Sequence, residues 1–186
     1  MIVVGLTGGI GAGKSTVAAM LAERGAVIVD TDLVAREVVV PGGPAHDALL
    51  ARFGTLDRAE LADIVFSDPG ALADLNAIVH PAVHDAVAAR LAAAAAAGVP
   101  IVVLVVPLLV ESANPYPTAG VLVVDCPEDV AVRRVVEGRG MAEADVRRRL
   151  AAQATRAQRL AVADFVVVND CSPADLGPQV DAAWSW

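Results

Sequence analysis

Aromatic side chains are scarce in this chain. Of its 186 residues, three are Phe, two are Trp and one is Tyr, although 56% are hydrophobic. The core must therefore be built from Ala, Val and Leu, and the chain is long enough for one domain with a small insertion. Long apolar runs are absent as well, since a run such as residues 101–106 is far shorter than the roughly 20 residues that span a bilayer.

Signals for secretion, disulfide bonding and nucleic-acid binding are also missing. The first residues enter an apolar run without the basic stretch and cleavage site of a secretory leader, so we expect a cytoplasmic protein with no membrane partner. Cys126 and Cys171 stand singly, and we interpret both as buried small residues. The net charge of −8 opposes a nucleic-acid partner and confines any anion site to a local cluster. No pattern assigns an oligomeric state.

A glycine-rich segment, residues 8–16, is the strongest motif and fits the spacing G-x-x-x-x-G-K-[ST]. It follows the apolar run 2–6 and precedes a helical pattern that begins at Val17. Glycines let the backbone fold around a polyphosphate, and the following helix adds its positive end. A glycine-rich turn that binds nothing is the alternative, but the context of strand, loop and helix favours a phosphate loop, the name used for residues 8–16.

The phosphate loop predicts ATP or GTP as a ligand. Lys14 would reach the outer phosphates, and the Ser15 hydroxyl would help to hold Mg²⁺ among water and phosphate oxygens. The motif does not identify what receives the phosphate. The residues expected to bind the nucleotide are Gly9, Gly11, Ala12, Gly13, Lys14, Ser15 and Thr16.

Apolar runs alternate with helical patterns along the chain. The runs are residues 2–6, 27–29, 101–106, 121–124 and 165–168. Continuous runs of Val and Ile indicate strands that are covered on both faces. The sequence therefore predicts a doubly wound α/β fold, with a parallel sheet of about five strands and helices on either side.

Residues 33–98 carry no strand signal and are typical of several helices. Asp57 is expected to cap one of them, and Pro81 to start the last, which ends at Gly98. Such an insertion can build a pocket for a second substrate beside the nucleotide, or it can be a packed extension without a ligand.

Basic residues cluster late in the chain, where eight of the fourteen lie between Arg133 and Arg159. In an acidic protein this cluster favours an anionic partner, although a solvated helix face explains Arg147 to Arg149 equally well. Arg139 is flanked by two glycines at a predicted hinge. An arginine on a mobile flap can close over transferring phosphates and exclude water.

Two carboxylates, Asp30 and Asp32, follow the second apolar run. The carboxyl ends of parallel strands border the ligand crevice, so both are expected to face the terminal phosphate. For Asp30, a helix N-cap explains the residue as well as a site role does. Asp32 is the candidate to accept a proton from an attacking hydroxyl or to hold a magnesium-bound water.

Five segments occur in one characteristic order along the chain. They are GLTGGIGAGKST at residues 5–16, DTDLVAR at 30–36, NAIVHP at 76–81, VPLLVE at 106–111 and QATR at 153–156, followed by Ala163-Asp164 and Asn169. Together they resemble the dephospho-coenzyme A kinase family over almost the whole chain. Several of them are more specific than the phosphate loop, which many unrelated enzymes share.

The resemblance implies transfer of the ATP γ-phosphate to the ribose 3′-hydroxyl of dephospho-coenzyme A, the last step of coenzyme A synthesis. It also implies a nucleotide-kinase-like core (1–31, 99–136 and 160–186), a helical acceptor-binding insertion (32–98) and a lid (137–159). Asp32 would be the base or metal organiser, with Lys14 and Arg139 as charge stabilisers. Asn169 would lie near the adenine. The acceptor side would include Thr7, Asp32, Arg36, His80, Glu111, Gln153 and Arg156.

Taken alone, two of these residues have simpler explanations, because His80 is typical of a packed or capping histidine and Glu111 of an ordinary helix charge. The chain also departs from the family pattern. Relatives usually have several more residues between the positions of Gly54 and Leu56. Many relatives also have the lid arginine one position earlier than Arg139.

Two other functions fit the phosphate loop. One is a small-molecule kinase with the same core, such as a kinase of shikimate, and the other is a nucleotide-dependent switch or binding module. The D-x-x-G and N-K-x-D segments of switch GTPases do not occur in the sequence. The segments at 76–81 and 106–111 favour the dephospho-coenzyme A kinase.

Overall fold

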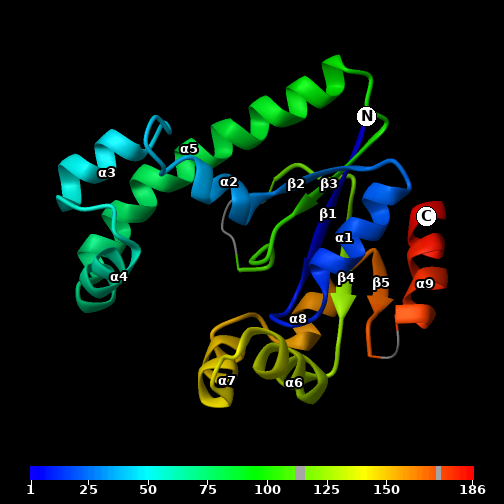
Figure 1. The fold of residues 1–186 in the computed structure, drawn as a ribbon. Helices are drawn as coiled ribbons and strands as arrows, with labels where there is room; N and C mark the ends of the chain where they lie inside the picture. The colour runs from blue at the N-terminus through cyan, green and yellow to red at the C-terminus, as the bar shows by residue number, and fades with distance from the viewer. Residues whose placement is uncertain (112–115, 171–172) are drawn as a thin grey trace. The chain divides into compact units, whose positions relative to one another are not determined.

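A five-stranded sheet lies at the centre of the larger part of the chain (Figure 1). The computed structural model describes residues 1–111, 116–170 and 173–186. The strands are β1 (Ile2–Gly8), β2 (Val27–Asp30), β3 (Ile101–Val105), β4 (Gly120–Asp125) and β5 (Phe165–Val168). Their order is β2-β3-β1-β4-β5, and β1 pairs in parallel with β3 and β4, as β4 does with β5.

Helices connect these strands and confirm the predicted α/β class. The five predicted apolar runs correspond to the five strands. The helices are α1 (Lys14–Glu23), α2 (Thr31–Glu37), α3 (His46–Phe53), α4 (Arg58–Ser67), α5 (Pro69–Ala96), α6 (Glu128–Arg139), α7 (Glu143–Ala151), α8 (Arg156–Ala161) and α9 (Pro173–Ser185).

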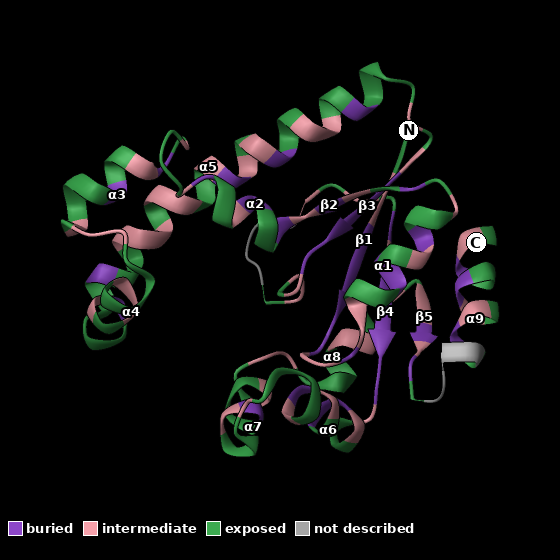
Figure 2. Ribbon diagram, viewed as in Figure 1, coloured by how far each residue is buried: buried purple, intermediate pink, exposed green. Residues whose placement is uncertain are grey.

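The central strands are buried on both faces, as the purple strands of Figure 2 show. In β3, Val102 and Leu104 are 0% exposed, while Val103 and Val105 are 2% and 4% exposed. Because successive side chains of a strand point to opposite faces, neither face of β3 meets water. This burial confirms the interpretation of the continuous Val and Ile runs.

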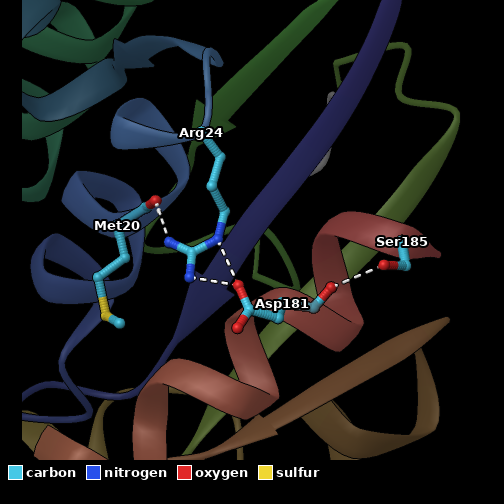
Figure 3. Close-up of polar contacts among 4 residues, drawn as sticks. All are labelled: Met20, Arg24, Asp181 and Ser185. Carbon is cyan, nitrogen blue, oxygen red and sulfur yellow. Dashed lines mark hydrogen bonds and ion pairs between the residues drawn. The ribbon is translucent and has the colours of Figure 1, made fainter.

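Two helices, α1 and α9, share one apolar core with the sheet. An ion pair also joins them: Arg24 Nε donates to Asp181 Oδ1 at 2.9 Å, and Arg24 donates to Met20 O at 2.6 Å (Figure 3). The Ser185 hydroxyl donates to the Asp181 carbonyl at 2.9 Å. Since the Asp181 carboxylate is exposed, such a pair contributes only about 0–1 kcal/mol, and the shared apolar core holds the two helices together.

The strand register brings three chain segments to one edge of the sheet. Gly8 at the end of β1 is opposite Val124, so the residues after Gly8 lie beside Asp125, the last residue of β4. The backbone N–H of Asn169 donates to the Asp125 carbonyl at 2.7 Å, which brings the end of β5 to the same edge. This is the carboxyl edge of the sheet, where ligands of open α/β sheets bind.

The described chain divides into two compact units, residues 1–29 with 94–186 and residues 30–93. In the second unit Asp57 caps α4 as predicted, because its carboxylate accepts hydrogen bonds from Ala59 N at 2.9 Å and Glu60 N at 3.1 Å. Gly54 ends α3 in the left-handed region, at φ 71°. The link from α3 to α4 is therefore a short turn.

The prediction that Pro81 starts a helix is wrong. Pro81 lies inside α5, which continues from Pro69 to Ala96. An internal proline removes one backbone hydrogen bond and costs about 3 kcal/mol. Val83 and Val87, on the following turns, are 8% and 1% exposed, and their burial helps to offset that cost.

The arginine-rich segment forms α6, α7 and α8 in the same compact unit as the sheet. Helix α6 continues through Gly138 and ends at Arg139, and Gly140 then adopts a left-handed φ of 63°. Of the two glycines beside Arg139, only Gly140 departs from the helix, and the hinge itself stays a prediction.

Two further predictions concern membranes and cysteines. Among the described residues, no helix combines the length and apolarity that a bilayer span requires. Cys126 is buried, as predicted, and is not part of a disulfide. Cys171 lies outside the described residues.

Candidate phosphate-transfer site

The phosphate loop turns from β1 into α1 through two glycines in the left-handed region. Gly11 has φ 75° and Gly13 has φ 95°, and a Cβ at residue 11 would lie 2.5 Å from the Ala131 carbonyl oxygen. The Gly13 carbonyl accepts the first helical bonds of α1, from Thr16 N and Val17 N, each at 3.1 Å. Both glycines are therefore needed for the loop to close over the start of the helix.

Lys14 folds its side chain back over the phosphate loop. Its Nζ donates to the Gly8 carbonyl at 2.8 Å and to the Gly9 carbonyl at 3.0 Å. The ammonium group is thus held at the mouth of the loop, where a compact cation can meet phosphate oxygens. Ser15 and Thr16 are exposed on the first turn of α1.

Asn169 supports the phosphate loop from the end of β5. Its side-chain Nδ2 donates to the Ala12 carbonyl at 2.8 Å, and the residue is only 7% exposed. A Cβ on Gly13 would lie 2.1 Å from the same Nδ2. The structure therefore gives Asn169 a contact with the loop, and its role beside an adenine stays a prediction.

Replacing Gly13 by alanine is expected to destabilise the protein by about 2–4 kcal/mol. The new Cβ would be forced into the left-handed region and would displace Asn169 Nδ2 from Ala12. Urea unfolding measures the change. Gly138→Ala is the matched control, because nothing lies within 4 Å of that Cβ and alanine in a helix is more favourable by about 0.5–1 kcal/mol. Equal stability of the two variants would contradict the prediction.

Residues 152–155, which join α7 to α8 and are named the connector, also contact the loop. Gln153 Oε1 accepts a hydrogen bond from Ile10 N at 3.0 Å. The backbone N–H of Ala154 donates to Glu111 Oε1 at 2.5 Å, and the Arg159 guanidinium donates to the Ala154 carbonyl. The structure therefore brings Gln153 and Glu111, both predicted site residues, together around the connector.

Arg156 forms the most buried ion pair of the site, with Asp125. Its Nε and Nη2 donate to the two carboxylate oxygens at 2.6–3.1 Å. The Asp125 side chain is 6% exposed, whereas that of Arg156 is 59% exposed. The hydrogen bond from Arg156 is the main reason why the pKa of the Asp125 carboxyl lies below its usual value.

This ion pair predicts a measurable loss of stability in acid. Because the pKa of Asp125 is lowered by folding, its stabilising effect is complete above the pKa of an unfolded aspartate, about 4, and is lost as the pH falls through the folded value. Asp125→Asn is therefore expected to lose less stability than the unaltered protein as the pH is lowered from about 5 to well below 4, the usual pKa of an unfolded aspartate. Urea midpoints across that range test this, and parallel curves would contradict it.

Sequence reasoning missed Asp125 and Arg159 as members of this site. The guanidinium of Arg159 lies 3.1–3.8 Å from the position of a Cβ on Gly9. Both side chains line a cavity of about 320 Å³ together with Gly9, Gln153 and Arg156. A carboxylate that directly follows an apolar run was the available signal for Asp125.

The side chains of three other predicted site residues, Thr7, Arg139 and His80, form no hydrogen bond with the described residues of the phosphate loop. Thr7 is 0% exposed and its hydroxyl donates to the Pro107 carbonyl at 3.4 Å, which favours a packing role over substrate contact. Arg139 is exposed at the end of α6, and His80 is exposed within α5.

The paired aspartates begin α2 in the second unit. Asp30 is the N-cap, accepting hydrogen bonds from Asp32 N at 2.8 Å and Leu33 N at 3.3 Å. Asp32 is exposed in the first turn, and Arg36 lies four residues later, on the same face of the helix. The N-cap explanation of Asp30 is therefore confirmed, and the Asp32 carboxylate is accessible.

No cluster of three or more acidic, His or Cys side chains suited to a metal occurs among the described residues. The protein ligand available beside Lys14 is the Ser15 hydroxyl. One hydroxyl fits Mg²⁺ that arrives with a nucleotide and is held mainly by water and phosphate oxygens, and it does not fit a resident metal.

Comparisons with known proteins agree with this geometry. A family model described as dephospho-CoA kinase matches residues 2–175. The dephospho-CoA kinase of Corynebacterium jeikeium is 46% identical over 191 residues, which cover 99% of this chain and 98% of that protein. The dephospho-CoA kinase of Thermobifida fusca is 49% identical over 194 residues, which cover 99% and 95%.

Solved structures show the same fold. TT1252 from Thermus thermophilus has a TM-score of 0.86 at 35% identity, covering 99% of this chain and 96% of that one. A shikimate kinase from Bacteroides thetaiotaomicron, with a TM-score of 0.54 at 15% identity and coverage of 99% and 96%, shares the fold alone. The family resemblance seen in the sequence is confirmed: the chain belongs to the dephospho-CoA kinase family.

Proposed function

We propose that this chain catalyses its family's reaction, the ATP-dependent phosphorylation of dephospho-coenzyme A to coenzyme A and ADP, with the phosphate loop as the donor site. The γ-phosphate would pass to the ribose 3′-hydroxyl. The observation that carries the proposal is the family match over residues 2–175, which includes both the phosphate loop and Asp32.

On the donor side, the loop amides and Lys14 bind and neutralise the phosphates of ATP. Phosphoryl transfer depends mainly on positioning and charge stabilisation, so backbone donors and one fixed ammonium supply much of what it needs. Arg139 adds charge from the end of α6, and Asn169 lies toward the adenine. Mg²⁺, held in part by Ser15, would neutralise charge on the phosphate oxygens.

On the acceptor side, Asp32 takes the proton of the attacking hydroxyl, or it would help to hold Mg²⁺ through a water. Its exposure in the first turn of α2 supports this role, because a general base must be reachable by the substrate. Arg36, on the same face of α2, and His80 bind the anionic acceptor. Glu111, Gln153 and Arg156 complete this assignment, with residues 32–98 as acceptor-binding insertion and 137–159 as lid.

A coupled assay of ADP release tests the function. With ATP and Mg²⁺, release of ADP is expected to require dephospho-coenzyme A, and shikimate at the same concentration is expected to give none. Chelation of Mg²⁺ is expected to stop turnover. ATP binding without coenzyme A formation would overturn the proposal. A cytoplasmic location is part of the proposal.

A further inference from the structure

The buried carboxylate of Asp125 has no role in the reaction as assigned, although it lies beside the phosphate loop. It is the last residue of β4, its side chain is 6% exposed, and it lines the same cavity as Gly9 and Ala12. Burying a charge is costly unless the charge is paired and hydrogen-bonded. We therefore expect this buried carboxylate to have a role at the phosphate loop.

The carboxylate fixes Arg156, and Arg156 is the first residue of α8. Three donor–acceptor distances of 2.6–3.1 Å make the contact a bidentate ion pair, which sets the orientation as well as the position of the guanidinium. Helix α8 begins rigidly, because Thr155 and Gln158 form a reciprocal capping box. Asp125 thereby anchors the start of α8 to the end of β4.

The connector leads from this anchor to the phosphate loop. Gln153, three residues before Arg156, accepts the hydrogen bond from Ile10 N at 3.0 Å and so fixes the peptide between Gly9 and Ile10. The guanidinium of Arg159, one turn into α8, donates to the Ala154 carbonyl and approaches Gly9. The chain of contacts from Asp125 through Arg156 and the connector therefore ends on the loop backbone.

We infer that Asp125 is a positioning residue, which holds the phosphate loop in its nucleotide-binding shape through Arg156 and the connector. If the ion pair of Asp125 with Arg156 is lost, the backbone at Ile10 gains conformational entropy. Nucleotide binding must then remove this entropy, so the affinity for the nucleotide falls. The effect on the nucleotide is measured with ADP alone, because Ile10 belongs to the donor loop whereas Gln153 and Arg156 are also assigned to the acceptor side. The inference rests on the proposed function only in taking the loop as the nucleotide site.

Equilibrium binding of ADP tests the inference without any acceptor, so its failure is distinguishable from failure of the proposed reaction. Asp125→Asn removes the charge and is expected to weaken ADP binding about five- to tenfold, the equivalent of one ordinary hydrogen bond. Asp181→Asn is the matched control, since it breaks the Arg24 ion pair at α9, and it is expected to bind ADP normally. Asp125→Glu retains the charge and is expected to restore part of the affinity.

Steady-state kinetics add a readout that general destabilisation would not produce. Asp125→Asn is expected to raise the KM for ATP by a similar factor, and Asp181→Asn is expected to leave it unchanged. Arg156→Lys keeps a cation but cannot form the bidentate ion pair. Because both changes break the same contact, the double variant Asp125→Asn with Arg156→Lys is expected to bind ADP no more weakly than either single variant. Normal ADP binding by Asp125→Asn, equal weakening by Asp181→Asn, or a change confined to the acceptor KM would overturn the inference. If Asp125→Asn does not fold, Arg156→Lys decides in the same way.

Discussion

Replacing Lys14 by methionine is expected to lower kcat/KM by about 10²- to 10³-fold, the usual effect of removing one preorganised donor from a transition state. Charge develops on phosphate oxygens during transfer, and Lys14 supplies a fixed ammonium group at the loop. Methionine keeps the length of the side chain and a good helix propensity at the start of α1. The measurement is the steady-state rate of ADP release at saturating acceptor.

The structure also predicts a cost in stability for this variant. Gly8 and Gly9 are buried, and their carbonyls would lose the bonds from Nζ at 2.8 Å and 3.0 Å. Urea unfolding measures the loss in the free energy of unfolding, about 1–3 kcal/mol, and so distinguishes it from the loss of turnover. Arg24→Met is the control, because it removes one cation from the other end of α1, and its turnover is expected to be normal. Similar rates for Lys14→Met and the unaltered protein would contradict the assignment.

Lys14 is the chain's single lysine, which allows a second test. Reductive methylation of amines can modify only this side chain and the N-terminus. ATP is expected to slow modification of Lys14 and to leave the N-terminus equally reactive, as mass spectrometry of the two peptides would show. Equal protection of both amines would contradict a direct contact of Lys14 with the nucleotide.

Features that depend on neighbouring residues could be predicted from the sequence. The phosphate loop has fixed spacing because Gly13 has a left-handed φ and a Cβ on Gly8 would lie 2.5 Å from the Val124 carbonyl oxygen, so both positions admit few other residues. Continuous Val and Ile runs predicted the strands because burial on both faces leaves no polar alternation. Asp57 could be identified as a cap because its partners lie two and three residues away.

Features that depend on distant residues could not be predicted in the same way. Asp125 and Arg156 are separated by 31 positions, and an aspartate after a strand gives no sign of which cation will reach it. Asn169 contacts Ala12 across 157 positions. Pro81 is a helix breaker by local rules, but the burial of Val83 and Val87 overrides that preference. Tertiary packing decided each of these cases.

Asp32→Asn is expected to lower kcat by about 10²- to 10⁴-fold, the range for loss of a general base. Asparagine has nearly the same shape but cannot take a proton from a hydroxyl. Asp32 is exposed and its backbone N–H, not its carboxylate, holds the cap contact with Asp30, so α2 is expected to form normally. The small loss of carboxylate charge near the helix start costs about 0.3–1 kcal/mol, too little to unfold the unit.

Asp30→Asn is the control that distinguishes a catalytic role of a carboxylate from its role as helix N-cap. Asparagine caps helices as well as aspartate does, so the bonds that Asp30 accepts from Asp32 N and Leu33 N can be kept. This variant is expected to retain turnover, while Asp32→Asn loses it and both bind ADP normally. If Asp32→Asn keeps the unaltered rate, the base lies elsewhere. If both variants lose turnover equally, the carboxylate pair acts together, and the assignment to Asp32 alone is wrong.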